Sequence, residues 1–449
     1  MTFKKTMNLH PLSKRLAAGQ GNPPRQVLES GVFTMKRNLF GVWMFPLFRF
    51  LFCTALIACL QPVLAHEHGK SDAMPVASSA CAQALVQCAR SATPVFGPEG
   101  KVWLLWSHED RLRLSTSLDG GSTFASTAVI SEKMPILDDN SEARPKLVLL
   151  ADGSLLVAVT QRDSHYVGRL LTARSVDGGQ TFTPFKPMLG GVGQRFETPL
   201  LLPSGRLVMA WLDWRNQAAA KAKGQAYKDS GIAVAWSDDN GQTFQGTSIL
   251  ADYSCDCCRI AAAVDRDGLA VFAWRHVFEG TTRDHAAAKL KDDGSFGPLR
   301  RIAVDDWKLD ACPRHGPSLA IGPDGSWHAM WFTGAAGKSA LQYARSMDQG
   351  VTFSAPQAIG NPAKSPARPQ VVAGTSNSVW RAWKEFDGHV TTVNVQRSAD
   401  NGLSWEATSE AARTGGASDH PLLVSSGDSV YLSWLTRDEG YRLKSLNKP

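Results

Sequence analysis

One short phrase recurs five times along this chain and limits the folds that the chain can adopt. The phrase is Ser-x-Asp-x-Gly-x-Thr/Ser-Phe/Trp, and a degenerate sixth copy keeps only some of these residues. The five good copies lie at 115–124, 173–182, 235–244, 344–353 and 396–405, and the degenerate copy lies at 289–296. Asp can accept hydrogen bonds from the amides of a tight turn, and Gly supplies the positive φ that such a turn needs. Because alternating apolar residues flank each copy, we predict a hairpin turn between two strands, anchored by a buried aromatic residue.

A second phrase lies between these turns. It is a strand led by proline, a turn that often contains Asp-Gly or Ser-Gly, and a strand that ends near tryptophan. Its seven leading positions are Pro94, Pro145, Pro199, Ala261, Pro317, Pro369 and Pro421. Together the two phrases give four short strands per repeat, which is typical of a propeller blade. We therefore expect an all-β fold, a β-propeller of four-stranded blades with seven repeats, in one domain from 81 to 446. Residues 84–89 are predicted to supply the fourth strand that the last repeat lacks, and so to close the ring.

The run from Met35 to Ala65 resembles an export signal. It has a basic start, a long apolar centre and small residues at its end, the order found in secretory signal peptides. We expect residues 1–34 to be an upstream extension, residues 66–80 to be a flexible lead, and the mature protein to be periplasmic or secreted. The alternatives are an uncleaved membrane anchor and a lipoprotein attached at Cys59.

The net charge of +7 does not indicate a nucleic-acid partner. The first 65 residues hold eight Lys or Arg and one acidic residue, so the rest of the chain has 40 basic residues (48 − 8) and 40 acidic residues (41 − 1). A neutral folded part gives no support for a basic nucleic-acid surface. Beyond the export signal, no other run is apolar enough to suggest a membrane span.

The five turns resemble the Asp-box, or bacterial neuraminidase repeat, of the sialidase superfamily. Sialidases of this family have six blades, so a six-bladed propeller is the alternative to the seven repeats. The resemblance implies an exo-glycosidase acting on sialic acid or another acidic glycan. In that family three arginines hold the ligand carboxylate, a Tyr activated by Glu is the nucleophile, and an Asp is the acid/base. Similar turns occur in proteins that are not enzymes. A non-catalytic propeller that binds a glycan or a protein is therefore the second interpretation.

The starts of the leading strands carry the residues that could bind an acidic ligand. These starts should share one face of the propeller, opposite the Asp-box turns, and most of them hold a charged residue or a histidine just before the leading position. The residues predicted to line an axial pocket there are Arg144, Arg259, Arg368, His315 and His420. Arg144 and Arg368 resemble the family's Arg-x-Pro motif most closely, and three arginines could hold a carboxylate through forked hydrogen bonds. The alternative is that they are solvated or pair with acidic residues, namely Glu197, Asp419 and Asp310.

The catalytic residues that the resemblance implies are harder to place. Tyr166 and Tyr253 lie on loops of the same predicted face, and either could be a nucleophile with Glu197 nearby. Asp163 or Asp213 could serve as the acid. Both aspartates could equally be ordinary loop residues, because Asp is common in turns.

A cysteine-rich stretch, SCDCCRI at 254–260, precedes the fourth leading position, and a further cysteine occupies the matching loop of the next repeat. The four cysteines are Cys255, Cys257, Cys258 and Cys312. In an exported protein we expect disulfides, one of which joins the two loops. The alternative is a soft-metal site for Cu(I) or zinc beside His315. A cleaved N-terminus beginning at His66-Glu67-His68 could also chelate copper, or could be a polar tail. No other cofactor is implied.

Overall fold

The computed structural model describes residues 85–125, 128–227 and 229–447, which belong to one compact unit. The predicted upstream extension, export signal, flexible lead and His66-Glu67-His68 sequence lie outside the described residues. No helix within the described ranges is long and apolar enough to cross a membrane.

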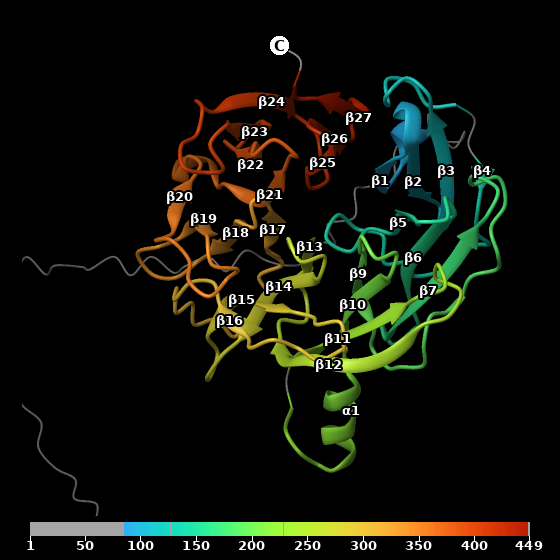
Figure 1. Ribbon diagram of the computed structural model, residues 1–449, viewed down its shortest axis with the longest axis horizontal. Helices are drawn as coiled ribbons and strands as arrows, with labels where there is room; N and C mark the ends of the chain where they lie inside the picture. Colours follow the sequence, from blue (N-terminus) through green and yellow to red (C-terminus); the bar gives the residue numbers. More distant parts are fainter. Residues whose placement is uncertain (1–84, 126–127, 228, 448–449) are drawn as a thin grey trace, which may run out of the picture. The chain divides into compact units, whose positions relative to one another are not determined.

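The inner strands of the repeats follow one another around a central axis (Figure 1). They are β1 (Ser91–Phe96), β5 (Lys146–Leu149), β9 (Arg195–Leu201), β13 (Ala261–Val264), β17 (Ser318–Ile321), β21 (Ala367–Ala373) and β25 (Leu422–Ser426). Each contacts the next in chain order, and β25 contacts β1. All seven predicted leading positions fall in these strands or directly before them. The all-β propeller predicted from the repeats is confirmed.

The second strands form the core. They are β2 (Val102–His108), β6 (Leu155–Arg162), β10 (Leu207–Asp213), β14 (Ala270–Val277), β18 (Trp327–Thr333), β22 (Val379–Phe386) and β26 (Ser429–Thr436). Six of them carry a fully buried tryptophan: Trp106, Trp211, Trp274, Trp331, Trp383 and Trp434. The second strands are buried along most of their length, for example in β2, β6 and β10. Burial on both faces favours mainly apolar residues, which agrees with the apolar runs of the second sequence phrase.

The Asp-box turns connect the third strands to the fourth. The third strands are β3 (Arg111–Ser117), β7 (Gly168–Ser175), β11 (Ser230–Ser237), β15 (Arg283–Lys289), β19 (Ala340–Ser346), β23 (Thr391–Ser398) and β27 (Gly440–Ser445). The fourth strands are β4 (Ala128–Val129), β8 (Lys186–Pro187), β12 (Gln245–Ser254), β16 (Arg300–Arg301), β20 (Gln357–Ile359) and β24 (Ser409–Thr414). In the turn after β11, the Ser237 hydroxyl donates to Asp239 at 2.7 Å and accepts from the Gly241 amide at 2.8 Å. The Asp239 carboxylate also accepts from Thr243.

The strands form six sheets, because the β9–β12 and β13–β16 repeats are joined into one sheet by pairing of Ser254 in β12 with His276 in β14. The last repeat has three strands. The prediction that residues 84–89 supply a fourth strand is wrong. Val86–Cys88 form a 3₁₀ helix that packs on β27. The amides of Cys88 and Ala89 donate to the carbonyls of Leu85 and Val86, so these two amides do not pair with β27.

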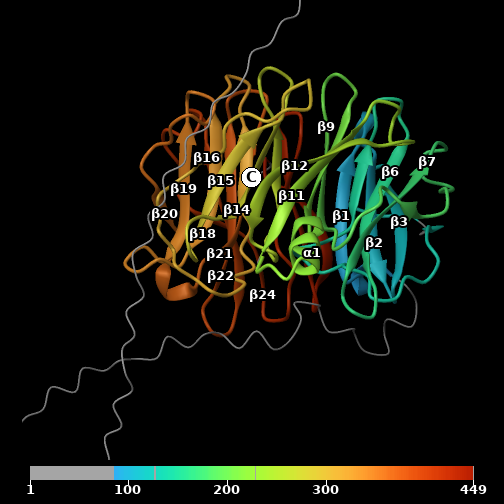
Figure 2. The same cartoon turned by 90° about the horizontal axis from the view of Figure 1, so that it is seen from below.

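Neighbouring strands are antiparallel and run between two end faces (Figure 2). The starts of the inner strands and the loops between second and third strands therefore share one end, which we call the start face. The Asp-box turns share the other end, the turn face. The helix α1 (Arg215–Ala222) lies in the β10–β11 loop, and two further 3₁₀ helices are short connections: Pro98–Gly100 and Pro362–Lys364.

Candidate functional site

The carboxylate of Glu142, in the loop before β5, joins the inner-strand starts of four other repeats. One carboxylate oxygen lies 2.9 Å from the Arg259 guanidinium, 3.1 Å from Nδ1 of His420 and 3.9 Å from the Arg368 guanidinium. The other oxygen accepts a hydrogen bond from the Gly316 amide at 3.0 Å. We call Glu142, Arg259, Arg368 and His420 the axial cluster.

The axial cluster is buried around Glu142 but keeps two cations partly exposed. Burial alone would raise the pKa of Glu142, but the charge of Arg259, the hydrogen bond to His420 and the charge of Arg368 hold that pKa well below its usual value. The Arg259 and Arg368 side chains are 17% and 16% exposed, so both keep some contact with solvent. Burial, reinforced by the charge of Arg368, lowers the pKa of His420 well below the usual value. The predicted grouping of Arg259, Arg368 and His420 is therefore present.

Arg368 is held in an unusual backbone conformation. Its φ is +58°, and the pairing of β21 with β22 shifts register between Ala367 and Gln370. Its guanidinium donates to the carbonyl of Arg314 in the neighbouring repeat, and Arg259 donates to the carbonyl of Pro369 at 2.9 Å. A left-handed conformation at a bulky residue costs energy and persists only where its surroundings enforce it. These contacts fix where the two guanidinium groups lie.

Arg144 does not face a ligand, contrary to the sequence-based prediction. Its side chain is only 3% exposed, and its guanidinium donates to the carbonyls of Ala92 and His420, each at 2.9 Å. It also lies 3.4 Å from the carboxylate of Asp419, the pairing named as the alternative. Burial raises the pKa of Asp419 to about 6, and Arg144 opposes that rise. Arg144 therefore joins three neighbouring repeats instead of binding a ligand.

His315 packs beside the axial cluster instead of contacting Glu142. Its ring stacks on Phe332 with centroids 4.4 Å apart. Arg275 donates to its carbonyl at 2.9 Å. Burial and the charge of Arg368 hold the pKa of His315 well below its usual value, so the ring is neutral near pH 7.

Glu197, predicted as a catalytic carboxylate, is a buried residue of β9, and the charge of Lys146 acts on it. Burial raises the pKa of Glu197, against the opposing charge of Lys146. Burial likewise lowers the pKa of Lys146, and the charges of Arg144 and Arg259 lower it further. One Glu197 oxygen accepts from the Thr160 hydroxyl at 2.7 Å, and the other has no hydrogen-bond partner among the described residues. A buried carboxyl whose pKa is raised is a candidate for proton transfer.

The two predicted nucleophiles lie outside the axial cluster. Tyr166 is 61% exposed, and its ring contacts Arg162. Tyr253 is 51% exposed and stacks on Tyr227 with centroids 5.4 Å apart. Within the described residues, neither tyrosine makes a recorded ring contact or hydrogen bond with the axial arginines. The structure therefore gives no support to either residue as a nucleophile.

The two predicted acids, Asp163 and Asp213, contact groups of their own turn or strand end. The Asp163 carboxylate accepts hydrogen bonds from the amides of His165 and Val167, which lower its pKa. Asp213 accepts from the indole of Trp211 and pairs with Arg215, both at 2.8 Å. A carboxyl whose pKa is lowered, as at Asp163, is a poor proton donor. The alternative role, as an ordinary loop carboxylate, describes Asp163 better, whereas Asp213 is a buried residue at the end of β10 that is held by its own partners.

The four cysteines meet as predicted, but as free thiols and not as disulfides. The sulfurs of Cys255, Cys257 and Cys312 lie within 4.8 Å of one another, and that of Cys258 is 3.5 Å from Cys255. We call these four residues the thiol cluster. The Cys255 and Cys257 sulfurs are 3.7 Å apart, far beyond the ~2 Å of a disulfide bond. Burial raises the pKa of Cys258 to about 12, whereas hydrogen bonds from Cys255 and Cys257 lower that of Cys312 to about 4.

Sequence reasoning missed two central residues, Glu142 and Lys146. Both belong to the EARPKL segment that was singled out for Arg144. The prediction considered only the two positions before each leading proline, and Glu142 is three positions before Pro145. A wider window would have included Glu142. The partial burial of Lys146 has no sequence signal, because lysine is usually exposed.

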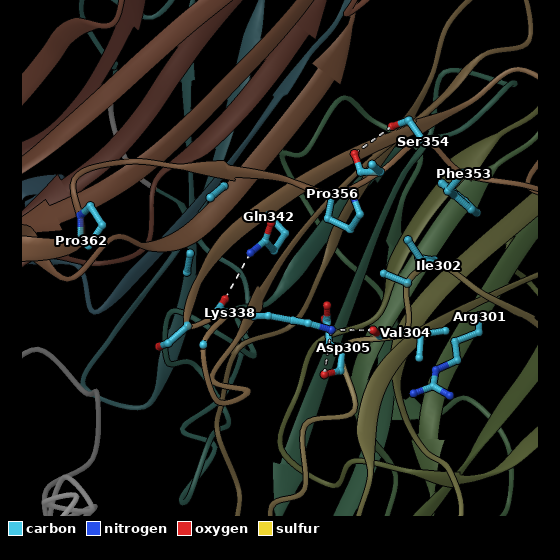
Figure 3. Close-up of a pocket in the computed structure, with 16 residues that line it drawn as sticks. Arg301, Ile302, Val304, Asp305, Lys338, Gln342, Phe353, Ser354, Pro356 and Pro362 are labelled. Atoms are coloured by element: carbon cyan, nitrogen blue, oxygen red, sulfur yellow. Dashed lines mark hydrogen bonds between the residues drawn. The ribbon is translucent and has the colours of Figure 1, made fainter.

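A cavity of about 980 Å³ lies at the periphery, between the β16 segment and the β19–β20 segment (Figure 3). Its polar side chains serve the local structure. Lys338 donates to the carbonyl of Val304 at 3.0 Å, and Gln342 donates to the carbonyl of Lys338 at 3.2 Å. The convergent charges are on the axis instead, so we place the candidate site at the axial cluster.

Comparison with known proteins relates the chain to others through its fold. No protein-family model matches the sequence, and no curated protein matches it. Among solved structures, it is similar to a PL25 ulvan lyase bound to -[GlcA(1-4)Rha3S]-, with a TM-score of 0.52, 10% identity, and coverage of 80% of this chain and 91% of the lyase. For the polysaccharide lyase Uly1 the TM-score is 0.50, with 10% identity and coverage of 79% and 88%. The NanB sialidase from Streptococcus pneumoniae matches with a TM-score of 0.45 and 9% identity, over 78% of this chain and 84% of the sialidase.

Proposed function

We propose that this protein binds an acidic carbohydrate on the start face of its propeller, through Arg259 and Arg368. The supporting observation is that these arginines, from separate repeats, are held side by side on one buried carboxylate while both stay partly exposed. Guanidinium groups fixed in this way can donate further hydrogen bonds to a ligand carboxylate or sulfate. The ulvan lyase, of similar fold, was solved with a glucuronate-containing sugar, which agrees with this ligand class.

Processing of the bound sugar is a second candidate function, with Glu197 as the candidate proton-transfer residue. Glu197 is buried in inner strand β9, and one of its carboxylate oxygens has no hydrogen-bond partner among the described residues. General acid–base catalysis needs groups whose pKa values lie near the working pH. Hydrolysis of sialosides is the narrower proposal. It has less support, because neither predicted tyrosine contacts the arginines.

Binding can be tested by titrating the mature protein with glucuronate and sialic acid oligosaccharides, with neutral oligosaccharides of the same length for comparison. Arg368→Ala should weaken binding of the acidic ligands by about tenfold or more, because a charge-assisted hydrogen bond is lost. Arg266→Ala is the matched control, since that arginine is 55% exposed and pairs only weakly, at 3.8 Å, with Asp267. Equal affinities for acidic and neutral ligands, or equal effects of the two variants, would contradict the proposal.

Catalysis can be tested separately with a fluorogenic sialoside and with uronate polysaccharides. Glu197→Gln should abolish turnover and leave binding of the acidic ligand nearly unchanged. Binding without turnover of either substrate class would identify the protein as a non-catalytic carbohydrate-binding propeller.

A further inference from the structure

The thiol cluster lies where the loops of two repeats meet, and the proposed carbohydrate site does not use it. Cys255, Cys257 and Cys258 are in the loop from β12 to β13, and Cys312 is in the loop from β16 to β17. The first three are buried, whereas Cys312 is exposed. The cluster therefore has both a protected interior and a route to solvent.

Ordinary core packing does not account for this arrangement. Buried cysteines often act as small apolar residues, but the three buried here form a cluster of their own, separate from the larger hydrophobic clusters of the blades. The fourth sulfur comes from an exposed loop residue, which contributes little to a core. Sulfurs bound to one ion at about 2.3 Å lie roughly 4 Å apart. The 3.7 Å between Cys255 and Cys257 matches that spacing.

The charges of two buried arginines, Arg275 and Arg283, act on the thiol cluster. Arg283 is 4% exposed, and the charges of Cys255 and Cys312 act on its guanidinium. It pairs with Asp229 at 3.1 Å and donates to the carbonyl of Leu309, while its second terminal nitrogen has no partner among the described residues. Arg275 is 1% exposed, and its carbonyl accepts the Cys255 amide at 2.9 Å. Such cations favour deprotonated thiols and offset the excess negative charge of a thiolate–metal complex.

We propose that Cys255, Cys257 and Cys312 bind one Cu(I) ion as a three-coordinate thiolate site. Soft thiolate ligands favour Cu(I), zinc and similar ions. Zinc in structural sites takes four ligands, whereas only three sulfurs here lie within 4.8 Å of one another. Binding forms three Cu–S bonds, and each of the three sulfurs that still carries a proton releases it to solvent as its S–H bond breaks. The metal enters and stays as Cu(I), so no electron is transferred.

The test is an anaerobic titration of the reduced mature protein with Cu(I), in competition with a Cu(I) chelator. We expect one Cu(I) per chain and a thiolate-to-copper absorption band. Cys312→Ser should weaken binding at least about 100-fold, and its exposed position should leave the thermal unfolding midpoint unchanged. Cys258→Ser is the matched control and should change affinity by less than about threefold. Zinc alone, titrated in parallel, should bind more weakly than Cu(I).

Three outcomes would overturn this assignment. The first is that four titratable thiols bind no metal. The second is that protein purified without reductant lacks free thiols at these four positions and regains them only on reduction, which would show disulfides. The third is a preference for zinc with loss of binding in Cys258→Ser, which would show a four-sulfur zinc site. Sugar binding should be the same in Cys312→Ser and wild type, so this proposal and the carbohydrate proposal can fail independently.

Discussion

The two end faces of the propeller are made from the same repeats but use them differently. On the turn face, five Asp-box turns repeat one hydrogen-bond pattern almost atom for atom, as in Ser175–Asp177 and Ser237–Asp239. On the start face, equivalent positions hold different residues, and these meet across repeats at Glu142. The repeated residues of the turn face thus stabilise each turn locally. The residues that differ between repeats on the start face make contacts that join distant parts of the chain.

The largest expected effect is on the start face. Glu142→Ala removes the carboxylate that neutralises Arg259 and Arg368 and lies beside the ring of His420, and so leaves a cationic group and a buried polar group without their partner. Losing one member of a buried charge network costs about 3–5 kcal/mol, so urea unfolding should show a loss near the upper end of that range. Glu132→Ala is the control, because that side chain is fully exposed. A loss below about 1 kcal/mol for Glu142→Ala would mean that the axial cluster does not join the repeats.

A second prediction separates the arginines that the sequence grouped together. Arg144→Met leaves Asp419 buried without its cation and should lower the free energy of unfolding by about 3 kcal/mol. Arg368→Ala breaks a longer, partly exposed pair and should cost under about 1 kcal/mol, although it weakens ligand binding. Both variants can be measured by urea unfolding at pH 7. If their losses are equal, the assignment of a structural role to one and a binding role to the other is wrong.

The same contrast shows what the sequence could predict. The Asp-box turns depend on residues at most seven positions apart, so their phrase alone predicts the hairpins, and the leading prolines predict the inner strands. The orientation of Arg144 depends on the carbonyl of His420, 276 residues away, and no local pattern contains that information. Cys312 was placed correctly near the other cysteines because the repeat register gave the equivalent loop. Whether the sulfurs bond to one another depends on ångström-scale distances that the register does not give.

A third prediction concerns the turn face, where effects should be small and equal. Ser237→Ala removes a buried hydroxyl that accepts from Gly241 and donates to Asp239, which should cost about 1 kcal/mol. The equivalent variants at Ser117, Ser175, Ser346 and Ser398 should show the same loss in urea unfolding, because their hydroxyls make the same bonds. Ser122→Ala, at an exposed turn position, is the control and should stay within about 0.5 kcal/mol. A wide spread among the five would show that the turns are not equivalent.

The smallest predicted effect is a change in pH dependence at one Asp-box. Hydrogen bonds from Thr352 and Ser346 lower the pKa of Asp348 to about 2, from 3.8. Because the folded-state pKa is lowered, the ionised carboxylate stabilises the fold above about pH 4, and this contribution is lost as the pH falls through about 2. Asp348→Asn removes that titration, so the gap between wild-type and variant urea midpoints should narrow between about pH 4 and pH 2. Ser122→Ala is the control, because it removes no titratable group and should therefore give a gap that does not vary with pH. A constant gap for Asp348→Asn would mean that the turn does not stabilise the ionised carboxylate, and the turn phrase would then act through backbone geometry alone.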